Sequence, residues 1–339
     1  MSWAHSIEYA QHALSTCSWE VCHQWLEQAL AECQQVAPER RVVTLNNLAI
    51  LFRRVHDYQQ AMACYEQALE MLEELPGVVW LRGRVLANLA ALEHRRGELI
   101  PARARYQEAL EVCSDPVVDE LAVAHIAVNL ALLHLQQDRS TQAETLLRRA
   151  RSMFQHHPDQ QFLEARYHLV QARLAIFQKR LTKAEMEALQ AIRMAQKLPT
   201  FDPVLQSQAR AALAQIYSRG ALSEAEQLQV AGDNTQRREQ ADVLFEEALT
   251  LLEDHGLSQA LEYLEALSLR LDHEIRIQNW QRAEATALQL LTRMETFEAL
   301  DPDFRARAWE RASKALGKLG KVEEAQVAHQ QWQRLVVRK

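Results

Sequence analysis

Residues 43–69 read VTLNNLAILFRRVHDYQQAMACYEQAL and contain two helical patterns joined by a short polar turn. Apolar and small residues recur at intervals of three and four in both halves: Leu45, Leu48, Ala49 and Phe52, then Tyr58, Ala61, Tyr65, Ala68 and Leu69. This spacing gives each helix one apolar stripe. Ala49 and Ala61 are small enough to let two helix backbones approach closely at their crossing. The stretch therefore predicts an antiparallel helical hairpin.

The hairpin pattern recurs along the chain. Its marker is Ala61, a small residue followed seven and eight positions later by Ala and an aliphatic residue. Strict or looser copies begin at Cys22, Ala102, Ala143, Ala184, Ala241, Ala283 and Ala325, at intervals of 39, 41, 41, 41, 57, 42 and 42 along the full series. Because one hairpin cannot bury both of its faces, a recurring hairpin implies a stack of repeats.

This pattern resembles the tetratricopeptide repeat. Its signature positions are occupied in order by Leu45, Leu48, Ala49, Phe52, Ala61, Tyr65 and Ala68. The period of 41 to 42 residues and the stretches TLNNLAIL and DYQQAMACYEQALEM are most similar to the kinesin-light-chain-like subclass, which has lengthened helices. The resemblance implies an all-α fold, a right-handed α-solenoid of about eight such hairpins.

We expect this solenoid to form a single domain over residues 1–339. The expected repeats cover residues 3–36, 39–75, 78–114, 117–157, 160–198, 203–255, 257–298 and 302–336. The sixth repeat carries an insertion at 219–238, which is either a loop or an extended helix pair, and either a functional flap or a tolerated surface insertion. The seventh repeat is the least regular, since Arg270 occupies a position where an apolar residue is expected.

Composition places the chain among globular proteins. Its 339 residues are 48% apolar and 24% charged, and no apolar run approaches the roughly 18 residues of a membrane helix. We expect no membrane insertion. The N-terminal stretch lacks the pattern of a secretory signal, so a cytoplasmic location is expected. The net charge of -7 argues against a nucleic-acid binder, whose affinity depends on neutralising phosphates.

Three asparagines form a regular series on the first helices of successive repeats. Asn47, Asn88 and Asn129 are 41 residues apart, and each directly precedes a Leu-Ala pair. They therefore project in the same direction from three helices. An asparagine side chain offers one acceptor and two donors, which complement a peptide backbone. In the families that the chain resembles, asparagines at such positions hold bound peptide. The alternative is that each asparagine bonds a neighbouring helix.

Arginines and apolar residues flank this series. The arginines Arg54, Arg84, Arg95, Arg166 and Arg173 come from first helices or their ends, and the apolar residues are Ile50, Ala91 and Leu132. Guanidinium groups can bind carboxylates or phosphates bidentately, which would favour an acidic peptide as ligand. The alternative is that these arginines are solvated or paired with nearby glutamates. The apolar residues would select side chains of the ligand.

The sequence contains no motif typical of an enzyme or of a metal site. A glycine-rich phosphate loop, HExxH and paired CxxC motifs are all missing. We therefore expect no catalytic residue, no metal and no cofactor.

The resulting functional hypothesis is a non-enzymatic adaptor or assembly scaffold. It would capture an extended segment of a protein or peptide in the concave groove of the solenoid. The alternative is a peptide-responsive sensor or regulator, whose superhelical pitch changes when a ligand binds. Near the C-terminus, Trp332, Leu335, Val336 and Val337 would either cap the array or pair with a second copy in a homodimer.

Overall fold

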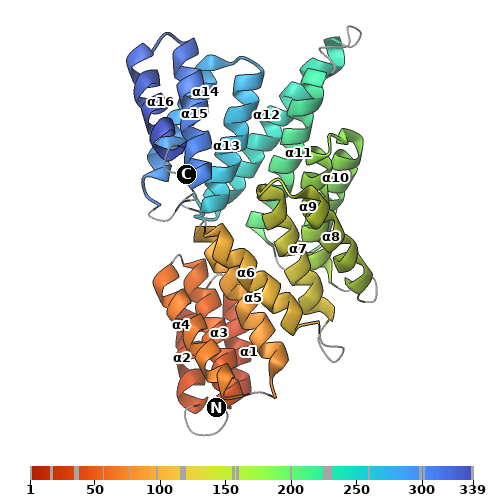
Figure 1. Cartoon of the computed structure of the whole chain (residues 1–339), viewed down its shortest axis with the longest axis vertical. Coiled ribbons are helices and arrows are strands. Elements are labelled where there is room, and N and C mark those ends of the chain that lie inside the picture. Colours follow the sequence, from red (N-terminus) through yellow and green to blue (C-terminus); the bar gives the residue numbers. More distant parts are fainter. Residues whose placement is uncertain are drawn as a thin grey trace. The chain divides into compact units, whose positions relative to one another are not determined.

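A computed structural model shows helices throughout (Figure 1). It describes residues 2–15, 18–33, 38–55, 57–75, 77–96, 98–114, 120–154, 157, 160–198, 201–223, 231–258, 260–297, 300 and 302–336. Within these ranges there are sixteen α-helices and no strand, so the predicted all-α repeat fold is confirmed. No helix in this part of the chain is both long and apolar enough to cross a lipid bilayer.

The odd-numbered helices are the first helices of the repeats and the even-numbered helices are the second. Their bounds are α1 Trp3–Ser15, α2 Trp19–Cys33, α3 Pro38–Arg54, α4 Tyr58–Glu73, α5 Val79–Arg96, α6 Leu99–Val112, α7 Glu120–Gln136, α8 Ser140–Phe154, α9 Gln161–Phe177, α10 Leu181–Gln196, α11 Pro203–Ser223, α12 Ala231–Asp254, α13 Leu261–Arg276, α14 Trp280–Met294, α15 Pro302–Lys318 and α16 Val322–Val336. The chain divides into two compact units, Met1–Leu133 with Arg148–His157, and His134–Leu147 with Pro158–Lys339.

The hairpin of α3 and α4 organises the core of the first unit. Ala49 and Ala61 are fully buried, as expected for small residues where two helices cross. Beside them Tyr65 fills the space toward α5 and is also fully buried. Helix α4 begins at Asp57, whose carboxylate accepts a hydrogen bond from the backbone N–H of Gln60 at 3.1 Å. The predicted hairpin of residues 43–69 is therefore present with its expected contacts.

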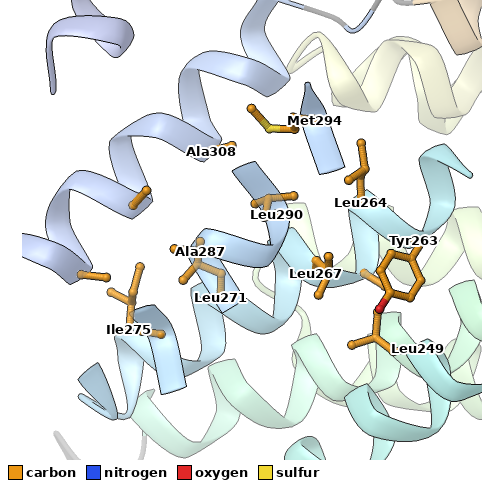
Figure 2. Packing of buried hydrophobic residues seen from close by; sticks show 14 of the residues in the cluster. Leu249, Tyr263, Leu264, Leu267, Leu271, Ile275, Ala287, Leu290, Met294 and Ala308 are labelled. Atoms are coloured by element: carbon orange, nitrogen blue, oxygen red, sulfur yellow. The ribbon is translucent and has the colours of Figure 1, made fainter. Parts of the chain in front are cut away.

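The core of the second unit joins α12, α13, α14 and α15. Figure 2 shows Leu264, Leu267 and Leu271 of α13 packed beside Leu290 and Met294 of α14. All five side chains are at most 4% exposed. Continuous burial along one side of α13 explains how the seventh hairpin keeps its place despite its irregular sequence.

The polar residues of α13 form a buried charged cluster with α12 and α14. Glu274 is completely buried, and its carboxylate accepts a hydrogen bond from Arg270 Nε at 3.0 Å. Arg270 also contacts Glu246 of α12 at 2.8 Å. Arg282 of α14 lies 3.1 Å from Asp242, whose carboxylate is 3.5 Å from the buried ring of His273. Arg270 therefore replaces the expected apolar residue because it neutralises two carboxylates.

The insertion at residues 219–238 lengthens the sixth hairpin. Helix α11 has 21 residues and α12 has 24, whereas the other helices have at most 18. Of the two forms considered for the insertion, the extended helix pair is the one observed. Residues 224–230, which connect these helices, lie outside the described ranges.

One glycine marks a close approach between α5 and α6. A Cβ atom added at Gly83 would lie 2.2 Å from Cys113 Sγ, far closer than van der Waals contact allows. Cys113 is itself 1% exposed and has little free space around it. Gly83 thus lets the two helices of this hairpin pack at their observed separation.

Replacing Gly83 by Ala should destabilise the protein by on the order of 1 kcal/mol, because overpacking costs about 1–3 kcal/mol and exceeds the helix preference of Ala over Gly, about 1 kcal/mol. In a Cys113→Ala background the same change should stabilise the protein, since the clashing sulfur is gone. Urea unfolding of the four proteins of this cycle measures the difference. Equal effects of Gly83→Ala in both backgrounds would contradict the proposed contact.

The buried ring of His273 predicts a pH dependence. Burial lowers the pKa of His273, and Arg282, Arg238 and Arg270 lower it further, whereas Asp242 raises it. The unfolded state therefore binds a proton more readily, so stability should fall as pH drops from about 6.5 toward the folded-state value. Burial raises the pKa of Glu274, which contributes in the opposite direction.

His273→Gln should therefore lose less unfolding free energy between pH 7 and pH 5 than the wild type. Both proteins retain Glu274, so the difference isolates the histidine. Chemical unfolding at several pH values provides the measurement, and identical pH profiles would exclude a contribution from His273.

Candidate functional site

On α3, α5 and α7, one face carries residues that are half-buried or exposed wherever the structure describes their side chains. Four positions at spacings of four, three and four residues share this face, because the spacing returns to the same side of a helix. They hold Val43, Asn47, Ile50 and Arg54 on α3; Arg84, Asn88, Ala91 and Arg95 on α5; His125, Asn129, Leu132 and Gln136 on α7. We call these residues the asparagine face. Gln136 falls in the second unit, and the other members belong to the first.

The three asparagines are half-buried, but their environments differ. Asn88 Nδ2 donates a hydrogen bond to Asn46 Oδ1 of the preceding first helix, at 2.9 Å. Asn46 is 5% exposed, so this bond satisfies a buried acceptor. Asn47 makes no side-chain hydrogen bond with another described residue. The structural interpretation of these asparagines thus applies to Asn88, whereas the amide of Asn47 is available to a ligand.

The arginines of this face occupy different surroundings. Arg84 is exposed, makes no ion pair with a described carboxylate, and lies over the ring of Trp80 at 5.9 Å from its centroid. Arg95 is half-buried, and its charge opposes the rise in the pKa of Tyr65 that burial causes. The side chain of Arg54 lies outside the described part of the structure. Arg84 is therefore the arginine best placed to meet an incoming carboxylate.

Besides Val43, which packs against the core, the apolar members of the face are Ile50, Ala91 and Leu132, and each is half-buried. Each follows its asparagine by three residues and therefore lies nearly one helical turn away on the same side. A polar amide and an apolar surface thus alternate along α3, α5 and α7. Such an arrangement can hold a backbone and contact a side chain at neighbouring points.

The corresponding positions of α9 and α11 in the second unit are buried. At the asparagine position α9 has Val170 and α11 has Ala212, which are 2% and 3% exposed. Arg173 of α9 lies 3.9 Å from Glu265 of α13 and so joins the two first helices that flank α11. The predicted contact of Arg173 with a ligand competes with this ion pair. Arg166 is half-buried and lies over the ring of Phe162 at 6.0 Å from its centroid.

Two residues of the site escaped the sequence interpretation. Asn46 directly precedes Asn47, but only the rotation of α3 against α5 shows that it meets Asn88. Trp80 precedes Arg84 by four residues and Asn88 by eight, so it continues the asparagine face toward the start of α5. Its ring is 41% exposed. The spacing of Trp80 was a usable signal, whereas the partner of Asn46 was not encoded in any local pattern.

The described residues contain no group of three or more His, Cys, Asp or Glu side chains placed to hold a metal ion. Helix faces in the first unit therefore offer hydrogen bonds, positive charge and apolar contact as their chemistry. These are the interactions used to recognise peptides and proteins.

Replacing Asn88 by Ala should cost about 1–3 kcal/mol of stability, because it leaves the buried oxygen of Asn46 without a donor. Asn47→Ala should change stability by less than about 0.5 kcal/mol, as is usual for a surface substitution. Urea unfolding measures the stability of both variants. The double variant Asn46→Ala with Asn88→Ala should be little less stable than Asn88→Ala alone, because it also removes the unpaired acceptor. Equal losses for Asn47→Ala and Asn88→Ala would show that the two asparagines have the same structural role.

Comparisons with known proteins agree with this geometry. The family model described as tetratricopeptide repeat matches residues 1–74 and 81–156. The search of curated proteins gives no match. Among solved structures, a Rap protein complexed with Competence and Sporulation Factor is 11% identical, with coverage of 99% of this chain and 98% of that chain and a TM-score of 0.62.

Two other solved structures are similar. A tetratricopeptide repeat protein from Parabacteroides merdae ATCC 43184 is 15% identical, with 93% of this chain and 98% of that chain covered and a TM-score of 0.51. BtubC (BKLC) from P. vanneervenii is 22% identical, with 75% and 91% covered and a TM-score of 0.48. The matched family model, the helical hairpins and the repeat period agree: residues 1–74 and 81–156 consist of tetratricopeptide repeats, and helical hairpins continue as far as α16.

Proposed function

We propose that the chain is an adaptor or assembly scaffold that captures an extended peptide segment of a partner on the asparagine face. The observation that carries this proposal is the half-buried amide of Asn47, which repeats a position shared with Asn88 and Asn129 and makes no side-chain hydrogen bond with another described residue. Tetratricopeptide repeats serve as protein-interaction scaffolds, and a Rap protein of similar fold was solved with a bound factor.

Capture would depend on a preformed surface. The first helices are held by the buried core of the unit, so their amides need little reordering when a ligand binds. Each asparagine can donate to a peptide carbonyl and accept from a peptide N–H, independently of the ligand's sequence. Asn88 would keep its bond to Asn46 through one N–H and offer its oxygen and second N–H to the ligand.

Selectivity would come from the side chains beside the asparagines. Arg84 would pair with an acidic residue of the ligand, and Arg54 and Arg95 would add positive charge. Ile50, Ala91 and Leu132 would contact apolar side chains. Within the second unit, Arg166 would contact a ligand separately, whereas Arg173 would first have to leave Glu265. The preferred partner is therefore an acidic protein segment.

The proposal includes a cytoplasmic location, a non-enzymatic role and one continuous domain over residues 1–339. It also includes a homodimer that forms through the end of α16, where Leu335 is half-buried and Val336 is 43% exposed. Val337 lies outside the described residues. Light scattering over a range of concentrations measures whether a second copy binds.

Binding can be tested with peptides selected from a random display library on the full chain. Asn47→Ala should weaken the binding of the selected peptides by about tenfold, the loss of affinity expected when one or two hydrogen bonds are removed. Gln67→Ala is the matched control, since Gln67 is exposed on the second helix α4. Fluorescence anisotropy gives the dissociation constants, and melting curves show whether both variants remain folded.

The proposed preference for acidic ligands is tested with the same peptides. Changing their Glu and Asp residues to Gln and Asn should weaken binding to the wild type but have little further effect on Arg84→Gln. If Asn47→Ala and Gln67→Ala bind every selected peptide as the wild type does, capture on the asparagine face is wrong.

A further inference from the structure

A cluster of arginines lies near the ends of α11 and α13 in the second unit, outside the asparagine face. Arg219 belongs to the last part of α11, and Arg276 is the final residue of α13. These two helices are in contact. Each arginine follows the crossing residue of its helix by five positions, Ala214 in α11 and Leu271 in α13, so the two occupy equivalent places in adjacent repeats.

Asp272, an acidic residue whose charge acts on Arg219, is already engaged. Asp272 lies one turn before Arg276, at the spacing where an Asp–Arg pair forms on a helix. Its carboxylate is instead held by Arg311 of α15 through two parallel contacts, Nε to Oδ1 at 2.6 Å and Nη2 to Oδ2 at 2.7 Å. Arg311 Nη1 also donates to Ser268 Oγ at 2.6 Å. This bidentate pair leaves Arg276 exposed and without a carboxylate partner among the described residues.

Arg219 is the more constrained of the two cations. Its Nε atom is buried and has no hydrogen-bond partner within the described ranges. Burial lowers the pKa of Arg219, the charge of Arg276 lowers it further, and Asp272 only partly opposes these effects. A guanidinium stays protonated under all ordinary conditions, so the side chain carries a partly desolvated charge next to a like charge.

Arg311 thus occupies the carboxylate of Asp272, and Arg219 and Arg276 have no carboxylate partner among the described residues. An unpaired, partly buried charge is unfavourable unless a counter-charge is supplied. Guanidinium groups bind planar and tetrahedral oxyanions bidentately, and the Arg311–Asp272 pair shows this geometry within the cluster.

We propose that Arg219 and Arg276 form a binding site for an oxyanion group, a carboxylate or a phosphate, carried by a ligand of the second unit. The site stands independently of peptide capture on the asparagine face, because no residue is shared between them. The site lies near the lengthened hairpin of α11 and α12, so this hairpin would lie beside the bound ligand.

The test measures binding of inorganic phosphate and of succinate to the full chain, each against sodium chloride at equal ionic strength. Nitrogen-15 NMR of the arginine Nε–H groups reports on the site, and melting curves report on linked stabilisation. The account predicts shifts of the Arg219 and Arg276 signals with at least one of the two anions. Their relative affinities then distinguish a phosphate from a carboxylate ligand.

Arg219→Gln should lower the affinity for the anion by at least about tenfold, the loss expected when a hydrogen bond to a charged group is removed. The same variant should melt no lower than the wild type in anion-free buffer, because it removes a poorly solvated charge. A purely structural arginine would give the opposite result, a lower melting temperature. Arg82→Gln is the control, since Arg82 is already paired with Glu108 at 3.0 Å.

Three outcomes would overturn the proposal. The first is an equal response to phosphate, succinate and chloride. The second is an unchanged anion response in both Arg219→Gln and Arg276→Gln. The third is a strong loss of stability in Arg219→Gln at every anion concentration.

Discussion

Close approach of helices at small residues is the constraint on which the structure depends. Ala49, Ala61 and Ala90 have no exposed surface, and larger side chains at these positions would separate the helices. Because the same small residues return with a period of about 41, successive first helices present the same positions on the same side. On α3, α5 and α7 the residue two positions before the crossing alanine is a half-buried asparagine, and the asparagine face is built on these positions.

The two units use this common framework differently. In the first unit, half-buried asparagines occupy the face, and Asn47 makes no side-chain hydrogen bond with another described residue. In the second unit, Val170 and Ala212 are buried at the same positions, and Arg173 is engaged with Glu265. The polar residues of α13 turn instead toward α12 and α14, where Arg270 and Arg282 both contact the buried carboxylate of Glu274. The oxyanion site proposed for the second unit therefore relies on charges near the helix ends.

Much of the fold could be predicted from the sequence because helix packing within a repeat is local. The hairpin of residues 43–69 shows its crossing residues and its apolar stripes directly. Contacts between repeats could not be predicted in this way. Asn88 meets Asn46 only because α5 is rotated against α3, and Arg173 meets Glu265 across 92 positions of sequence. The irregular seventh repeat was explained only by carboxylates that neighbouring helices supply.

The most direct measurement of the central claim is site-specific photo-crosslinking from the asparagine face. A photoreactive residue at position 91, on the first helix α5, should crosslink to a partner segment or to a selected peptide. The same residue at position 104, where Ala104 is exposed on the second helix α6, should give little product. Mass spectrometry of the products identifies the contacting segment. Strong crosslinking from position 104 and none from position 91 would contradict the account.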